Sequence, residues 1–171
     1  MAEHRFFIEP SAVDDDRIEL SPEGAHHIGK VLRLSGGDEI LLLDGTGNHF
    51  RTVIDRLGAS GGSARIIERW FADENALSIR LIQALPKGEK FDLILQKGTE
   101  LGINRFSPIS SGRSIAKAAR IEKKLARWRR IVAEAARQSR RPLLPACDPV
   151  KPLAETVADS RQELKLMLWE E

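Results

Sequence analysis

Cysteine and histidine are both scarce in this chain. Cys147 is the single cysteine among 171 residues, so no disulfide can form within the chain, and four scattered histidines argue against a zinc site. No apolar run approaches the roughly 20 residues that are needed to cross a bilayer. Residues 1–17 carry acids where a signal peptide needs a basic start and an apolar stretch. We therefore expect a cytoplasmic protein that holds no metal and enters no membrane.

Acidic residues are nearly missing from one long segment. Arg113–Arg141 holds eleven lysines or arginines in 29 positions, but only two acids, Glu122 and Glu134. Its net charge is +9, so the rest of the chain must carry −7 to give the total of +2. Concentrated positive charge attracts polyanions, because binding to phosphates releases condensed counterions. The alternative is a solvated helix face, but such faces normally mix charges of both signs. We therefore favour nucleic acid as the partner.

Residues 1–70 are predicted to be rich in strands. Short runs of isoleucine, valine, leucine and phenylalanine are separated by glycine, aspartate, asparagine or serine turns. Ser21, Pro22 and Glu23 form a helix start signal before Ala25 and Ile28. Many short strands at close spacing favour a small antiparallel barrel. The expected strands cover residues 4–9, 17–21, 38–45, 48–57 and 63–71, with turns at 35–38, 44–48 and 58–63.

After Trp70 the pattern changes to alternating strands and helices. Residues 88–101 place Phe91 and Leu95 on one side of a helix that Gly102 ends. In the basic segment, apolar residues recur at helical spacing, with most cations opposite them. This alternation predicts a parallel sheet covered by helices, and hence an α/β domain. The expected strands are 78–86, 104–110, 141–146 and 163–169, and a further helix covers 153–160.

Three short motifs suggest functions that their context does not support. SGGDEI at residues 35–40 superficially resembles the GGDEF signature of diguanylate cyclases, but nothing upstream supplies the metal-binding acid. DGTGN at residues 44–48 lacks the Gly-Lys-Ser/Thr of a phosphate-binding loop. We interpret both as turns. His26 and His27 are consecutive on a short helix and face different directions, which argues against a shared metal but leaves RNA contact open.

Four separated segments carry a specific resemblance. They are HRFF (His4–Phe7), HHIGKVLRLSGGDEILLLDGTG (His26–Gly47), QALPKGEKFDLILQKGTELGI (Gln83–Ile103) and EAARQSRRPLLP (Glu134–Pro145). In this order they resemble the methyltransferases that modify uridine at N3 in 16S ribosomal RNA of the small ribosomal subunit. The resemblance implies a PUA-like RNA-binding β-barrel over residues 1–72 and a SPOUT domain over 73–171. The SPOUT domain of the family is an α/β domain whose trefoil knot binds S-adenosylmethionine. A homodimer, with the site near the subunit interface, is also implied.

In the family, the chain continues for several dozen residues past the position of Trp169. Those residues complete the knot and form the main loops around S-adenosylmethionine. We therefore expect the knot to be incomplete in these 171 residues, and the fragment alone to bind the methyl donor weakly and to be inactive. Leu168 and Glu170 are the candidate donor contacts that remain.

The implied reaction defines the candidate site residues. The target base must be unpaired or turned out of its stack, and its N3 must lose a proton. A general base can take this proton, or cations can stabilise charge on the neighbouring carbonyl oxygens. The catalytic candidates are Lys97, Glu100 and Arg140, with Glu100 acting either as the base or to orient Lys97. The implied RNA contacts are Arg5, His27, Arg33, Lys87, Arg113, Lys117, Lys123, Lys124, Arg127, Arg130, Gln138 and Arg141.

Two other functions are compatible with some of these features. A non-catalytic RNA-binding or ribosome-associated protein would use the same barrel and basic helix. A cyclic-dinucleotide enzyme is a more distant alternative.

Overall fold

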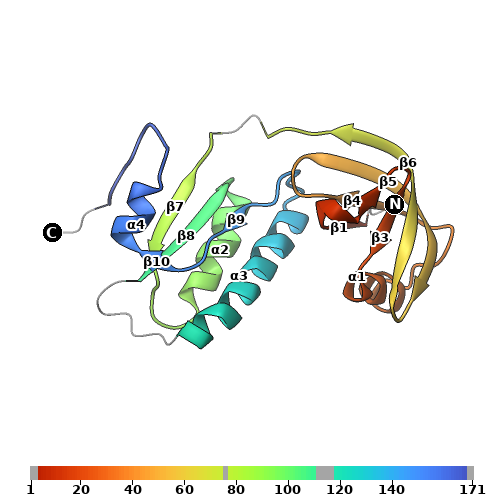
Figure 1. The fold of residues 1–171 in the computed structure, drawn as a ribbon, viewed down its shortest axis with the longest axis horizontal. Coiled ribbons are helices and arrows are strands. Elements are labelled where there is room, and N and C mark those ends of the chain that lie inside the picture. Colours follow the sequence, from red (N-terminus) through yellow and green to blue (C-terminus); the bar gives the residue numbers. More distant parts are fainter. Residues whose placement is uncertain (1–3, 75–76, 111–117, 169–171) are drawn as a thin grey trace. The chain divides into compact units, whose positions relative to one another are not determined.

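A computed structural model describes residues 4–74, 77–110 and 118–168, with side chains of the longest helix described from Lys123 onward. The chain divides into two compact units (Figure 1). The N-terminal unit comprises Met1–Asn75 and Ala136–Leu144, and the C-terminal unit comprises Ala76–Ala135 and Pro145–Glu171.

The N-terminal unit is built on a curled six-stranded sheet with the order β1-β4-β5-β6-β3-β2. All neighbouring strands are antiparallel except β1 and β4, which are parallel. The prediction of a wholly antiparallel sheet was therefore wrong for this pair. A tight hairpin forces two strands to run antiparallel, but a long connection does not. Since a long connection joins β1 to β4, these two strands can pair in parallel. The strands are β1 (Arg5–Phe7), β2 (Val13–Asp14), β3 (Arg17–Leu20), β4 (Glu39–Leu43), β5 (Asn48–Gly58) and β6 (Gly61–Phe71).

The hairpin of β5 and β6 gives this sheet its curvature. Both strands are 11 residues long, and their register shifts near Arg51 and again near Ile54. Such β-bulges increase the local twist and bend the strands. Gly61 starts β6 at a φ of 128°, and a Cβ atom there would lie 2.6 Å from the Leu20 carbonyl oxygen. The concave side encloses a core that includes Ile18, Ile28, Leu42, Phe50 and Ile54.

Short helical segments connect the first strands. Ser21 caps α1 (Pro22–His26), because its hydroxyl oxygen accepts a hydrogen bond from the Gly24 amide at 3.1 Å. This confirms the predicted helix start. A π-helical turn, η2 (His27–Val31), continues α1. The 3₁₀ turn η1 (Pro10–Ala12) and the two-residue β2 were not predicted.

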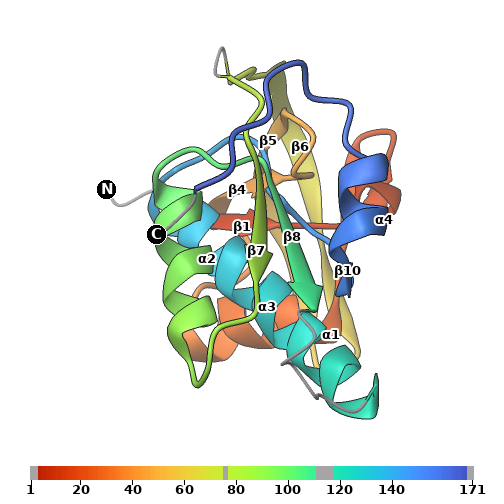
Figure 2. The same cartoon turned by 90° about the vertical axis from the view of Figure 1, so that its left-hand side faces the viewer.

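The C-terminal unit is a parallel sheet with helices, as predicted. Its strands β7 (Arg80–Ala84), β8 (Arg105–Ser110) and β10 (Lys151–Pro152) lie in the order β10-β8-β7, and β9 (Ala146–Cys147) also pairs with β8. Every pair is parallel. The helices are α2 (Lys90–Glu100), α3 (Ala118–Gln138) and α4 (Leu153–Ala158). In Figure 1, α2 and α3 lie on one side of this sheet and α4 on the other; in Figure 2, α4 lies beside β10, away from α2.

Alternating residues of β7 and β8 face these two sides. Leu81 and Phe106 pack with α2 and α3 around the Phe91 and Trp128 rings, whose centroids are 4.7 Å apart. The intervening positions therefore face the α4 side, and they include Arg80 and Arg105, which are paired in the strand register. One face of the sheet is thus apolar, and the other carries the two arginines.

Two predicted strands differ in the structure. In the first, residues 141–146, Ala146 pairs with β8 and Leu143 forms an isolated antiparallel bridge to Thr46. No continuous strand forms, because Pro142 and Pro145 lack the amide proton that a ladder needs. In the second, residues 163–168 lie in no strand, and Leu168 is fully exposed. A strand forms only against a neighbour, and among the described residues this segment has none.

Candidate functional site

The outward face of α3 carries the cations that the sequence singled out. Lys123, Lys124 and Arg130 are exposed, whereas Trp128 and Val132 on the opposite stripe are buried in the core. Among the described residues, these three cations have no ion-pair partner. Their positive charge is therefore available to a polyanion.

Arg127 is the exception on this helix. Its guanidinium donates hydrogen bonds to Asp92 and, at 3.4 Å, to Glu89. Both acids lie at the start of α2, so their ion pairs with Arg127 join α2 to α3. The prediction that the helix has almost no acids to pair with overlooked these two, because they are distant in sequence.

Lys97 and Glu100 form a pair at the end of α2. The Lys97 Nζ atom donates to Glu100 Oε2 at 2.7 Å, and the lysine side chain is 56% exposed. The position of a cation in the last turn also suits the helix dipole. The structure therefore brings two of the three catalytic candidates together on an accessible surface.

Arg141 and Arg140 differ sharply although they are adjacent. Arg141 is buried, and its Nε and Nη2 atoms donate to the Glu74 carboxylate at 2.8 and 2.5 Å. A guanidinium held this way is not available to RNA, so the sequence-based role of Arg141 has no support in this geometry. Arg140 has a φ of 58° and an exposed side chain, and its carbonyl oxygen accepts a hydrogen bond from Arg5 Nη1 at 3.3 Å.

The remaining candidates lie at separate places within their own units. His27 is exposed, and its ring lies edge-on to the Phe6 ring, with 5.8 Å between the two ring centroids. Arg33 is exposed with a φ of 61°, Lys87 is exposed just after β7, and Gln138 is exposed at the end of α3. The candidates that lie outside the described residues are Arg113, Lys117 and Glu170.

The two glycine-rich motifs are turns, as predicted. In the first, the Ser35 amide donates to Asp38 Oδ2 at 2.7 Å. In the second, Asp44 accepts hydrogen bonds from the Thr46 amide and from Asn48. Burial alone would raise the pKa of Asp44, but these hydrogen bonds outweigh it and lower that pKa.

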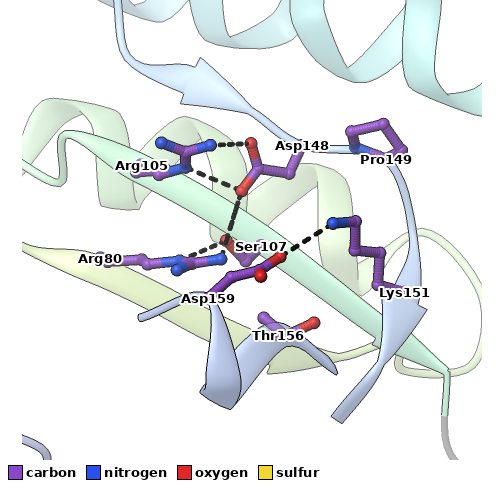
Figure 3. A pocket seen from close by; sticks show the side chains of 8 residues that line it. All are labelled: Arg80, Arg105, Ser107, Asp148, Pro149, Lys151, Thr156 and Asp159. Atoms are coloured by element: carbon purple, nitrogen blue, oxygen red, sulfur yellow. Dashed lines mark hydrogen bonds and ion pairs between the residues drawn. The ribbon is translucent and has the colours of Figure 1, made fainter. Parts of the chain in front are cut away.

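A charged cavity of about 330 Å³ borders α4 in the C-terminal unit, and the sequence reasoning missed it (Figure 3). At its centre, Asp148 Oδ2 accepts hydrogen bonds from Arg105 Nε at 2.8 Å and from Ser107 Oγ at 2.6 Å. Arg105 Nη2 donates to the other oxygen, Oδ1, at 2.8 Å. The signal in the sequence was charge inside predicted strands, since an arginine in a buried parallel strand needs a partner. The lining residues are Arg80, Arg105, Ser107, Asp148, Pro149, Lys151, Thr156 and Asp159.

Electrostatics favour the ionised forms in this network. Burial alone would raise the pKa of Asp148, but hydrogen bonds from Arg105 and Ser107 and the nearby Arg80 charge hold it below its usual value. The hydrogen bond between Lys151 and Asp159 raises the pKa of the lysine and lowers that of the aspartate.

Two observations bear on metal and thiol chemistry. Among the described residues, no cluster of three or more histidine, cysteine, aspartate or glutamate side chains could hold a metal ion. Burial raises the pKa of the Cys147 thiol to about 11, so the thiol stays protonated at neutral pH and is a poor nucleophile.

No helix within the described part of the chain is long and apolar enough to cross a membrane.

Taken together, a curled-sheet unit, a parallel α/β unit and a cationic helix define a two-part α/β protein whose exposed charge suits a polyanion. Two family models match it: "RNA methyltransferase domain" over residues 73–171 and "RNA methyltransferase PUA domain" over residues 20–66. The chain therefore belongs to the RNA methyltransferase family.

Curated relatives bear one name, ribosomal RNA small subunit methyltransferase E. The protein from Mycobacterium bovis is 36% identical over 140 residues, which cover 81% of this chain and 53% of the relative. The Bacillus subtilis protein is 36% identical over 151 residues, covering 82% of this chain and 57% of the relative. The chain thus spans about half the length of these relatives.

Solved structures agree with this family assignment. The Neisseria gonorrhoeae ribosomal RNA small subunit methyltransferase E, bound to S-adenosylmethionine, has a TM-score of 0.80 and 31% identity, covering 94% of this chain and 67% of that one. A putative methyltransferase from Legionella pneumophila in complex with S-adenosylmethionine has a TM-score of 0.84 and 27% identity, covering 97% and 70%.

Proposed function

We propose that this chain acts in the methylation of N3 of a specific uridine in 16S ribosomal RNA, with S-adenosylmethionine as the methyl donor. The observation that carries the proposal is the RNA methyltransferase family match over residues 73–171. The names of the curated relatives and the donor bound to two structural neighbours support it.

The proposal includes an arrangement of domains. Residues 1–72 form a PUA-like RNA-binding domain, and residues 73–171 belong to a SPOUT domain with a trefoil knot. The enzyme works in the cytoplasm as a homodimer, with the small ribosomal subunit as its partner. The family match to the PUA model over residues 20–66 supports the first of these assignments.

The cavity beside α4 and the exposed Leu168 do not fit S-adenosylmethionine. The cavity beside α4 is lined by Arg80, Arg105 and Lys151, whose positive charges would repel a sulfonium ion. Leu168, a candidate donor contact, has a fully exposed side chain and encloses nothing. We therefore derive no step of the reaction through these residues.

The RNA contribution of this chain is easier to assign. Lys123, Lys124 and Arg130 contact backbone phosphates, supported by their exposure on one face of α3. Arg127 contributes less to RNA binding, because Asp92 and Glu89 neutralise its charge. Contacts to phosphates position the RNA without reading its sequence.

Lys97 is the proposed cation for a uracil carbonyl oxygen, and Arg140 remains a separate catalytic candidate on the other unit. Loss of the N3 proton leaves negative charge on the uracil carbonyl oxygens, and a nearby cation stabilises that charge. Glu100 orients Lys97, because its carboxylate accepts the hydrogen bond from Lys97 Nζ at 2.7 Å. A positioned lysine loses less side-chain entropy on contact with the base than a free one would.

Mass mapping of 16S ribosomal RNA from cells that lack the gene tests the proposed activity. We expect one N3-methyluridine to disappear and to return when the gene is restored. A non-catalytic RNA-binding protein would leave every methylated uridine in place, and that result would overturn the proposal.

The same cells test the residue roles. Restoring the gene with Lys97→Ala or Arg140→Ala should leave the uridine largely unmethylated, whereas Lys90→Ala, which removes another exposed lysine of α2, should restore it fully. Glu100→Gln should retain much of the activity, because the amide oxygen still accepts the lysine hydrogen bond. Full methylation with both alanine variants would show the assignment to be wrong.

The RNA role of α3 has a separate test in the salt dependence of binding. The logarithm of the affinity for a 16S ribosomal RNA hairpin should fall linearly with the logarithm of salt concentration, and each lost phosphate contact should reduce the slope by about 1. Lys124→Glu should reduce the slope, whereas Lys165→Glu, an exposed lysine outside any helix or strand, should not. Equal slopes for the two variants would refute the α3 interface.

A further inference from the structure

The charged cavity of the C-terminal unit has one cation that its neighbours leave incompletely satisfied. The Arg80 side chain is only 9% exposed. Its Nε atom donates to Ser107 Oγ at 2.8 Å, but its Nη2 atom lies 3.6 Å from Asp148 Oδ2, beyond hydrogen-bonding distance. A guanidinium carries four of its five N–H donors on the two Nη atoms. Among the described residues, those four donors have no acceptor.

The Nη atoms of Arg80 are not among the buried side-chain atoms without a partner in the described residues, so they open into the cavity that Arg80 lines. A guanidinium placed there can donate hydrogen bonds to a group that enters the cavity. In Figure 3, the Arg80 guanidinium points toward Ser107 and Asp148, among the residues that line the cavity. An anion in this cavity can therefore accept hydrogen bonds from the Arg80 Nη atoms.

The carboxylates of the cavity do not fill this role, because each has its own partner. Asp148 accepts from Arg105 through two hydrogen bonds and from Ser107 through a third. Asp159 Oδ2 accepts from Lys151 Nζ at 2.9 Å. Three cations and two carboxylates line the cavity, which leaves a net charge of +1. The Arg80 Nη donors and the net positive charge of the lining both favour binding of an anion.

We propose that this cavity binds a phosphate group, held by Arg80 with help from Lys151. A phosphate offers several acceptor oxygens, and arginine pairs with it through two parallel hydrogen bonds. The volume of a phosphate group is well below the 330 Å³ of the cavity, so a phosphate ester also fits. The group comes either from an RNA backbone or from free phosphate. The site is separate from the α3 interface and does not depend on the proposed methylation.

Titration of the whole chain with inorganic phosphate at low salt, followed by isothermal calorimetry, tests the site. We expect one phosphate per chain. Lys151→Met should weaken binding about tenfold, because it removes a charge-assisted contact. Asp159→Asn should strengthen binding, because it removes a negative charge from the wall, and Asp159 is exposed enough for the variant to fold. Lys165→Met, which removes an exposed lysine outside the cavity, serves as the matched control and should bind phosphate like the parent.

Arg80→Met should abolish phosphate binding, and circular dichroism shows whether it folds. If it does not fold, the opposite effects of Lys151→Met and Asp159→Asn still decide the question. Absence of phosphate binding to the parent, or equal binding by these two variants, would overturn the proposal. Competition with a short oligouridylate then identifies the source: displacement of phosphate indicates an RNA backbone, and no displacement indicates a free phosphate group.

Discussion

Replacing Asp148 by asparagine should lower the free energy of unfolding of the C-terminal unit by about 2 kcal/mol at neutral pH. The carboxylate joins three chain segments, since it follows β9 and accepts hydrogen bonds from Arg105 and Ser107 on β8 while facing Arg80 on β7. Asparagine has the same size but carries no charge. The substitution therefore tests the charge of this network rather than its packing.

The magnitude follows from burial. The Asp148 and Arg80 side chains are 16% and 9% exposed, so water screens their attraction only weakly. A hydrogen bond to a charged group contributes about 1.5–3 kcal/mol when it is protected in this way. Arg105 is 52% exposed, and its share is discounted because solvent screens it. The asparagine oxygen can still accept one hydrogen bond, which brings the expected loss to about 2 kcal/mol.

Urea unfolding followed by circular dichroism measures this loss. The helical signal reports mainly on the C-terminal unit, because α2 and most of α3 belong to it. With a urea slope of about 1–3 kcal/mol per molar, the midpoint should fall by about 1 M. Asp16→Asn, which changes an exposed acid of the N-terminal unit, is the matched control and should leave the midpoint unchanged. Equal midpoints for Asp148→Asn and the parent would refute the reasoning.

The pH dependence gives an independent check on the same carboxylate. Its pKa is lower in the folded chain than in the unfolded chain, so its stabilisation is complete above the unfolded value of about 3.9. That stabilisation is lost as the pH falls through the folded pKa. The difference between the parent and Asp148→Asn should therefore stay constant from pH 7 to about 5 and shrink below about 4. A difference that grew on acidification would contradict the assigned sign.

Three further substitutions test other parts of the fold. Glu74→Gln should destabilise the N-terminal unit by about 3 kcal/mol, measured by thermal unfolding, because it leaves the Arg141 guanidinium buried without its carboxylate. Gly98→Ala should cost about 1–2 kcal/mol in urea unfolding despite the better helix propensity of alanine, because its Cβ would lie 2.7 Å from the buried Phe106 ring; a stabilised variant would contradict this contact. Ser21→Ala should cost about 1 kcal/mol through loss of the α1 cap, and an unchanged melting temperature would show that the cap contributes nothing.

Local signals in the sequence were sufficient for most of the elements. The Ser21-Pro22 start of α1 and the Gly102 stop of α2 depend on residues within one turn, and Gly102 has the positive φ, 96°, of a helix end. The spacing of Trp128 and Val132 likewise identified the buried stripe of α3, because helical periodicity is a property of neighbouring residues.

The errors arose where an outcome depends on distant partners. Residues 163–168 have the composition of a buried strand, but a strand also needs a neighbour to supply its hydrogen bonds. The RNA role of Arg141 stays a prediction, but its pairing with Glu74 could not be foreseen, because the two residues are 67 positions apart. Arg127 was counted as a free cation because Asp92 is 35 residues distant in the chain.

The sequence by itself determined most of the strands and helices, the cationic face of α3 and the family resemblance, because each depends on residue types at short spacing. Only the tertiary structure decided which charges remain accessible. Folding buries Arg141 against Glu74, pairs Arg127 with α2, and collects Arg80, Asp148 and Lys151 around one cavity. Electrostatic interactions act through space and fall off with distance, so the function of a charge depends on which partners the fold brings within a few ångströms.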